Sequence, residues 1–121
     1  IRGIRERILV GENASEQVMQ SYRSDISDEV SDLIVKSFFE AKAINIGYQR
    51  ADGLSTQRSI EVHYLFLNWP VWYLIAWDCD RQASRTFRID RVENVSVSRE
   101  VFSLKSLNVF SGELARFSSH L

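Results

Sequence analysis

One stretch of the chain, VWYLIAWD at residues 71–78, limits the possible folds more than any other. In a strand, alternate residues point to opposite faces. Here both sets are apolar, with Val71, Tyr73, Ile75 and Trp77 against Trp72, Leu74 and Ala76. A strand with two apolar faces must be covered on both sides. We therefore expect one face to fill a small barrel and the other to lie under a helix or a partner.

The segment before this strand predicts a helix. Ser27 is a good N-cap residue, and Asp28 and Glu29 follow it where the helix dipole favours negative charge. Apolar residues then recur at steps of three and four, at Val30, Leu33, Ile34, Phe38 and Ala41. This spacing predicts an amphipathic helix over residues 28–42.

After residue 42 the apolar period changes to two, which indicates strands. The alternation predicts five of them, at 44–49, around Ile60 and Val62, and at 71–78, 85–91 and 92–98. An Asp-Gly pair at 52–53 and a Trp-Pro pair at 69–70 mark turns between them. This pattern is typical of an α+β, mostly β fold: a small, strongly bent antiparallel five-stranded barrel of the SH3 type, preceded by an α-helix.

The two ends of the chain show weaker patterns. Residues 1–27 combine a short apolar run with Gly11 and Asn13, which interrupt it, and predict connecting structure rather than core. Residues 103–121 space their apolar side chains unevenly around Gly112 and predict a short helical or irregular tail. The first residues show no initiator methionine and no signal-peptide pattern, so we expect a fragment excised from a longer protein.

Composition and charge exclude several classes of protein. The chain is 45% hydrophobic and 26% charged, as soluble domains are, and no apolar run reaches the roughly 18 residues of a membrane helix. The single cysteine, Cys79, cannot form an internal disulfide, which is consistent with a reducing cytoplasm. A net charge of -1 argues against a protein that binds nucleic acid over its whole surface, so any anion site must be local.

The residues that carry chemistry do not suggest an enzyme. His63 and His120 are the only histidines, and no cluster has the spacing of a zinc site. Cys79 lies between Asp78 and Asp80, whose charges would raise the pKa of its thiol. The sequence also lacks glycine-rich phosphate loops and the serine nucleophile motif. We expect no catalysis, no metal and no cofactor.

Arginines gather just after the apolar strand, at Arg81, Arg85, Arg88 and Arg91. Arginine binds phosphate through two parallel hydrogen bonds, and side chains held by a sheet lose little rotamer freedom on binding. In a strand over RTFRIDR, residues 85–91, Arg88 and Asp90 face outward. The alternative is a surface ion pair, such as Arg88 with Asp90, worth less than about 1 kcal/mol.

Several segments, in order, resemble the WYL-domain family. Residues 72–74 are the Trp-Tyr-Leu tripeptide that names the family, and RTFRIDRV at 85–92 follows at the family's spacing. Upstream, INIGYQRADG at 44–53 resembles the family's strand that ends in a tyrosine and a polar hairpin. VHYLFLN at 62–68 resembles its histidine-bearing segment. The resemblance covers about residues 28–102.

The resemblance implies a fold and a context. WYL domains are similar to Sm-type, SH3-like barrels with a helix in front. The chain would then consist of a linker at 1–27, the WYL domain at 28–102 and a tail at 103–121. In the family, such domains follow a helix-turn-helix or winged-helix DNA-binding domain in bacterial transcription regulators, which are cytoplasmic and often form homodimers. That DNA-binding domain is missing here, so we do not expect this chain to bind an operator by itself.

The resemblance also implies a ligand site. In the family, a pocket of tyrosine, histidine and arginine senses a negatively charged ligand, such as single-stranded nucleic acid or a nucleotide. Carried over to this sequence, the ligand-binding residues are Tyr48, His63, Arg85, Arg88 and Arg91. Arg88 would be the main cation, and the Trp-Tyr-Leu tripeptide would be mostly structural. Val62 stands where many members have a proline.

We therefore expect a non-enzymatic, ligand-sensing regulatory domain of a bacterial transcription regulator, with no membrane partner. Two alternatives stay open: a purely structural dimerisation module, and an Sm-like protein that binds single-stranded nucleic acid directly. A structural module would keep its role when Arg88 is replaced. A direct binder would show salt-dependent affinity for oligonucleotides.

Overall fold

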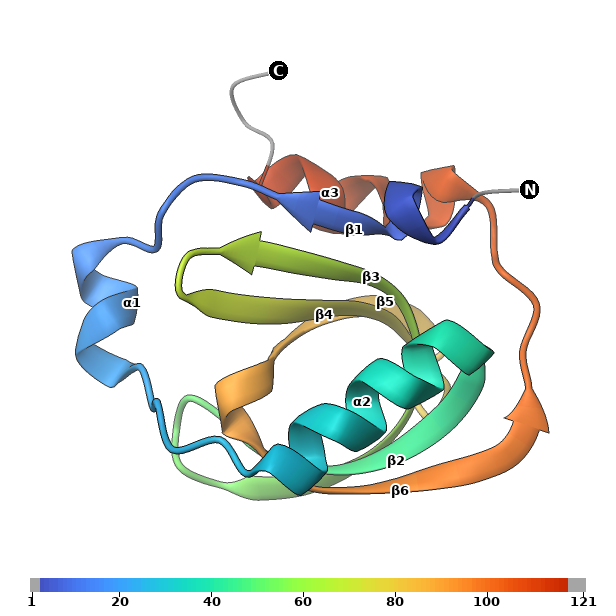
Figure 1. Ribbon diagram of the computed structural model, residues 1–121, viewed down its shortest axis with the longest axis horizontal. Coiled ribbons are helices and arrows are strands. Elements are labelled where there is room, and N and C mark those ends of the chain that lie inside the picture. The colour runs from blue at the N-terminus through green and yellow to red at the C-terminus, as the bar shows by residue number, and fades with distance from the viewer. Residues whose placement is uncertain (1–2, 118–121) are drawn as a thin grey trace.

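The predicted helix forms as α2, Asp28–Glu40, in the computed structural model of the protein, which describes residues 3–117 (Figure 1). Ser27 caps it, because its hydroxyl accepts a hydrogen bond from the backbone N–H of Val30 at 3.1 Å. The helix ends at Glu40, two residues before the predicted end, since Ala41 adopts the left-handed conformation with φ 52°. Of the helices in residues 3–117, none combines the length and the apolar character that a membrane-spanning segment requires.

Residues 3–117 contain six strands: β1 Ile8–Val10, β2 Lys42–Gln49, β3 Ser55–Asn68, β4 Val71–Asp78, β5 Ala83–Arg88 and β6 Val92–Val101. Their order is β5-β4-β3-β2-β6, and each of these neighbouring pairs is antiparallel. The predicted hairpin at Asp52-Gly53 joins β2 to β3, and Gly53 has the positive φ, 87°, that its turn requires. The predicted α+β, mostly β class is confirmed.

The sheet curves beside α2 but does not close (Figure 1). β5 and β6 are its outer strands, and within the described part of the chain they do not pair with each other. The predicted five-stranded barrel is therefore not confirmed, and the likeness to Sm and SH3 barrels stays a prediction. β1 was not predicted; it pairs in parallel with β3, and its three residues are too few to show an apolar period.

Both faces of β4 are covered, as its apolar sequence predicts. On one face, Leu74 and Ala76 are fully buried in a cluster that includes Ile34 of α2. On the other face, Ile75 is fully buried in a second cluster that includes Phe110, from the C-terminal part of the chain. The molecule therefore has apolar packing on both sides of one central strand.

Both chain ends cover the second face of β4. β1 and α1 (Glu16–Ser21) come from the N-terminal side, and η3 (Leu107–Phe110) and α3 (Ser111–Phe117) follow β6. Figure 1 shows β1 and α3 on the same side of the molecule. Residues that pack against this cluster from the two ends are Leu9, Ala14, Val18, Tyr22, Val109 and Leu114. The segment predicted as connecting structure thus contributes to the core; residues 118–121 of the predicted tail lie outside the described residues.

A buried arginine of the N-terminal segment holds β3 where its register with β4 shifts. The shift lies between Val62 and Tyr64. Arg7, at the end of the 3-10 helix η1 (Ile4–Arg7), donates hydrogen bonds to the backbone carbonyls of His63 at 2.8 Å and Val62 at 3.1 Å. Its guanidinium carbon also lies 4.3 Å from the ring centre of Phe38. The sequence did not predict this role, because Arg7 is more than fifty positions away from both carbonyls.

β5 ends earlier than predicted. The strand expected over 85–91 stops at Arg88, and Ile89–Arg91 form a 3-10 turn, η2. The side chains of Arg88 and Asp90 pair inside the protein, where both residues are buried and contact Ser21 and Arg23 of the segment before α2. The prediction that these two side chains face outward is therefore wrong. The ion pair lets both charges be buried, because each satisfies the other.

Candidate functional site

The structure does not bring the five predicted ligand-binding residues into one pocket. Tyr48 and Arg85 line a cavity rich in arginine. Arg91 lines a second cavity, next to α2. Arg88 is held in a buried ion pair, and His63 is buried under the C-terminal segment. The surroundings of each side chain determine whether it is available to bind an anion.

The arginine cavity has a volume of about 190 Å³ and lies between the end of β2, the start of β3, the β4–β5 turn and β5. Its lining residues are Tyr48, Arg50, Thr56, Arg58, Arg81, Arg85, Thr86 and Phe87. Tyr48 and Arg85 are predicted site residues, whereas Arg50, Arg58 and Arg81 were not predicted to have this role. A signal was present for two of these, since the hairpin pairs Tyr48 with Thr56 and so brings Arg50 and Arg58 to the same end of the sheet.

Two aspartates, buried Asp78 and exposed Asp80, hold the β4–β5 turn in place. One carboxylate oxygen of Asp78 accepts hydrogen bonds from the backbone N–H groups of Asp80 at 3.0 Å and Arg81 at 3.1 Å. Asp80 in turn accepts a hydrogen bond from the N–H of Ser59, on β3, at 2.8 Å. The backbone of Arg81 is therefore fixed relative to β3, and so to Arg58 on the same strand.

The arginine cavity carries an excess of positive charge. Arg50 pairs with exposed Asp52 at 3.0 Å. Arg58 lies 3.7 Å from the second carboxylate oxygen of Asp78, which is fully buried and has no hydrogen bond. Arg81 and Arg85 have no carboxylate partner among residues 3–117. Two guanidinium groups are thus available to an anion.

The predicted main cation, Arg88, is already paired. Its guanidinium donates to both carboxylate oxygens of Asp90, from Nε at 3.0 Å and from Nη2 at 2.7 Å, and from Nη1 to the hydroxyl of Ser21 at 3.0 Å. The side chains of Arg88 and Asp90 are 10% and 1% exposed. The hydrogen bonds to Asp90 raise the pKa of Arg88. This is the ion pair considered from the sequence, but it lies in the interior and not on the surface.

Tyr48 connects this ion pair to the arginine cavity. Its hydroxyl accepts a hydrogen bond from the backbone N–H of Arg88 at 2.9 Å. Its ring packs edge-on against Phe87, with ring centres 5.0 Å apart. Burial raises the pKa of the Tyr48 hydroxyl, so the group stays protonated at neutral pH. The wall of the arginine cavity is therefore tied to the backbone of Arg88.

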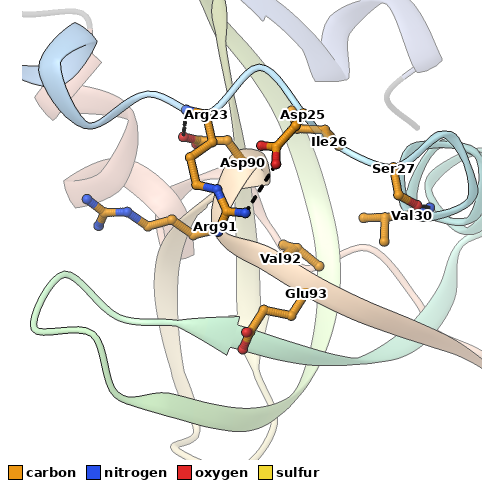
Figure 2. Close-up of a pocket in the computed structure, with 9 residues that line it drawn as sticks. All are labelled: Arg23, Asp25, Ile26, Ser27, Val30, Asp90, Arg91, Val92 and Glu93. Atoms are coloured by element: carbon orange, nitrogen blue, oxygen red, sulfur yellow. Dashed lines mark hydrogen bonds and ion pairs between the residues drawn. The ribbon is translucent and has the colours of Figure 1, made fainter.

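Arg91 lies on the rim of a different cavity, of about 240 Å³, shown in Figure 2. Its side chain extends away from Ser27 and Val30 at the start of α2 (Figure 2). Arg23, on the same cavity, donates its backbone N–H to Asp90 at 3.1 Å and its guanidinium to Asp25 at 3.4 Å. Carboxylates therefore accompany the arginines here, which makes this second cavity a poorer anion site than the arginine cavity.

His63 is fully buried, and both of its ring nitrogens have backbone partners. The N–H of Lys105 donates to Nε2 at 3.1 Å, so we assign the proton to Nδ1, which lies 2.9 Å from the carbonyl oxygen of Glu61. The rings of Phe102 and Phe110 pack beside it, with centres 5.1 and 4.5 Å away. The structure thus places His63 against the segment after β6 and not in the arginine cavity.

Comparison with known proteins agrees with the motifs in the sequence. The sequence model of the WYL domain matches residues 29–97, more than half of the chain. The chain belongs to the WYL-domain family. Among solved structures, this WYL domain is similar to proteasome accessory factor B/C (PafBC) of Arthrobacter aurescens, with a TM-score of 0.56 and 20% identity. The match covers 77% of this chain and 13% of that chain, and at this identity it supports the fold alone.

The tripeptide that names the WYL domain has a structural role. Leu74 is fully buried in the first cluster, and Trp72 packs against the same cluster. Tyr73 points to the opposite side and is buried in the second cluster. The three residues therefore hold the two sides of the WYL domain together through β4, as expected.

The thiol of Cys79, in the β4–β5 turn, has a raised pKa. Burial is the largest cause, followed by the charge of Glu61; Asp80 and Asp78 add smaller effects in the same direction. Since the thiolate is the reactive form, we expect iodoacetamide to alkylate Cys79 of the folded WYL domain several-fold more slowly at pH 7 than a free thiol. Unfolding in urea should restore the ordinary rate. A folded-state rate equal to that of the unfolded chain would contradict the raised pKa.

Proposed function

We propose that this WYL domain is a non-enzymatic regulatory domain that senses a negatively charged ligand, a nucleic acid or a nucleotide, at the arginine cavity. The observation that carries the proposal is the pair Arg81 and Arg85, which line one cavity without a carboxylate partner in the described chain. Membership of the WYL-domain family supports a regulatory, ligand-sensing role.

Preorganisation supports the same proposal. The backbone of Arg81 is held by Asp78, and the side chain of Arg58 is only 15% exposed. Arginines that are already ordered lose less conformational entropy when an anion binds. The planar guanidinium also matches the oxygens of a phosphate through paired hydrogen bonds. Direct contacts to the ligand would therefore come from Arg58, Arg81 and Arg85.

The other predicted residues take indirect parts in this proposal. Arg88 supports the cavity through the hydrogen bond from its N–H to the hydroxyl of Tyr48. Arg91 adds positive charge near β6, outside the arginine cavity. His63 anchors the C-terminal segment through Lys105. The ligand pocket of this WYL domain would thus be centred between the β2–β3 hairpin and the β4–β5 turn.

We place the domain in a cytoplasmic, bacterial transcription regulator that acts as a homodimer, with DNA bound by a helix-turn-helix domain outside residues 1–121. A ligand can shift such a dimer only if it binds one arrangement more tightly than the other. The nearest alternative is an Sm-like protein that binds single-stranded nucleic acid directly, because the nucleic acid would bind in the same arginine cavity.

Exposed apolar side chains on α2 support the alternative of a structural dimerisation role. Val35 and Phe39 of α2 are 41% and 54% exposed, although both are large and apolar. Val35 lines an apolar cavity of about 270 Å³ together with Ile26, Ser31, Leu65, Trp72 and Ile89. A chain with this role alone would not bind anionic ligands through the arginine cavity, so a binding experiment separates the two functions.

The test is a fluorescence-anisotropy titration of short labelled single-stranded DNA and RNA at about 50 and 200 mM salt. We expect salt-dependent binding that the double variant R81A/R85A weakens by on the order of tenfold, with a smaller salt slope, because two phosphate contacts are lost. The matched control R5A/R99A removes the same charge from exposed positions on η1 and β6. It should change the affinity by less than about twofold.

Two results would contradict the proposed function. If neither DNA nor RNA binds at the lower salt concentration, the cavity does not serve nucleic acid. If both double variants weaken binding equally, only net charge matters and the arginine cavity has no special part. Thermal melts of the variants check that each remains folded.

A further inference from the structure

We propose that the arginine cavity recognises a terminal phosphate monoester, the group at a phosphorylated strand end or on a free nucleotide, in preference to an internal phosphodiester. This inference rests on the proposed function and names the chemical group that the site selects. Three properties of the arginine cavity carry it: its charge, its size and the chemistry of its walls.

The charge of the cavity matches a phosphate monoester. Arg50 and Arg58 each lie close to a carboxylate, which leaves Arg81 and Arg85 without one in the described chain. A phosphate monoester carries about -1.5 to -2 charges at pH 7. An internal phosphodiester carries about one. Two available guanidinium groups therefore complement a strand end better than they complement the middle of a strand.

The size of the cavity suits one phosphate. The cavity has a volume of about 190 Å³ and is open to solvent on one side. One phosphate group fits inside it, and the rest of a strand would extend into solvent. The negative charge that meets Arg81 and Arg85 inside the cavity is then mainly that of a single phosphate.

The walls of the cavity favour phosphate over base. Its two aromatic residues pack against each other in a T-shaped contact, and Phe87 is almost fully buried, so only part of Tyr48 could stack on a base. The hydroxyl of Thr86 donates to Glu113 at 2.9 Å and is not free to donate to a base. Guanidinium groups remain as the main donors, and contacts of this kind position a phosphate without reading sequence.

The experiment measures, by fluorescence anisotropy, how tightly four oligonucleotide strands of matched sequence bind to the protein of residues 1–121. The first strand carries a 5′-phosphate, the second a 3′-phosphate, and the third has hydroxyls at both ends. The fourth also has hydroxyls at both ends but is two nucleotides longer, so that its total charge matches that of the phosphorylated strands. We expect at least one phosphorylated strand to bind on the order of tenfold more tightly than the charge-matched strand. R81A/R85A should reduce this preference to less than about twofold, and R5A/R99A should keep it.

Competition separates the two sources of the group. A nucleoside 5′-monophosphate should displace a phosphorylated strand, whereas the corresponding nucleoside should not, if the monoester is what the arginine cavity selects. Equal affinity for the phosphorylated and charge-matched strands would overturn the inference while leaving the proposed anion site intact. A preference that R81A/R85A retains would place the monoester elsewhere on the protein. Failure of the proposed function itself looks different, because then no strand binds in a way that depends on the cavity.

Discussion

Replacing Asp90 with alanine is expected to lower the free energy of unfolding by about 3–5 kcal/mol. The carboxylate of Asp90 accepts two hydrogen bonds from the buried guanidinium of Arg88 and one from the backbone N–H of Arg23. Without it, the Arg88 charge would remain in the interior with Ser21 as its side-chain partner. Urea denaturation followed by tryptophan fluorescence measures the loss.

Two further variants isolate the ion pair. D25A removes a carboxylate from an exposed pair, 3.4 Å from Arg23, and should leave the free energy of unfolding almost unchanged. The double variant R88M/D90L replaces both buried charges with apolar side chains and should recover most of the stability lost in D90A, because no unpaired charge is left. If D90A is no less stable than D25A, or if the double variant is as unstable as D90A, the buried pair does not have the role described.

The second large effect is expected at Phe110. This residue is fully buried, with its ring centre 4.5 Å from that of His63 and 5.7 Å from that of Tyr64. Truncation to alanine removes the largest buried side chain of the C-terminal segment and leaves a cavity beside β3. We expect F110A to lower the free energy of unfolding by about 3–5 kcal/mol, measured by urea denaturation.

A neighbour in the same 3-10 helix provides the control. Leu107 is 54% exposed, so L107A should change the stability by less than about 0.5 kcal/mol. If F110A is as mild as L107A, the segment after β6 does not pack on the sheet as described. A large loss in F110A alone would show that residues 103–117 belong to the folded unit.

The Arg88–Asp90 pair also connects the arginine cavity to the N-terminal part of the chain. The Arg88–Asp90 pair holds Ser21 and Arg23, which precede α2. The same Arg88 donates its backbone N–H to Tyr48, in the wall of the arginine cavity. A short series of hydrogen bonds therefore connects the wall of the arginine cavity, at Tyr48, to the segment before α2, at Ser21 and Arg23. Any displacement of Tyr48 by a ligand would act directly on these contacts.

The sequence predicts the parts of this fold that depend on residues close together in the chain. The three- and four-residue spacing after Ser27 predicted α2 to within two residues at its C-terminal end. The Asp-Gly pair predicted the β2–β3 hairpin. The two apolar faces of residues 71–78 predicted that β4 is covered on both sides. Each of these patterns reflects main-chain geometry over a few residues, which a sequence displays directly.

The site could be predicted only in part. Tyr48 and Arg85 do line the arginine cavity, but His63 was expected beside them and instead packs against Phe102 and Phe110. Arg88 does alternate with the inward-facing Phe87 at the end of β5, but the segment before α2 covers its face of the sheet, where Ser21 contacts the guanidinium. Alternation predicts on which face of the sheet a side chain lies, but not whether a distant segment covers that face.

The sequence by itself determined the helix, the hairpin, the doubly covered strand and the motifs of the WYL-domain family. Only the tertiary structure decided which charges are available and which are satisfied. Arg88 meets Ser21 across 67 positions, and the arginine cavity joins segments on both sides of β4. Contacts between residues this far apart in the chain depend on how the sheet curves and where its turns lie. They produce no periodic pattern in the sequence from which they could be predicted.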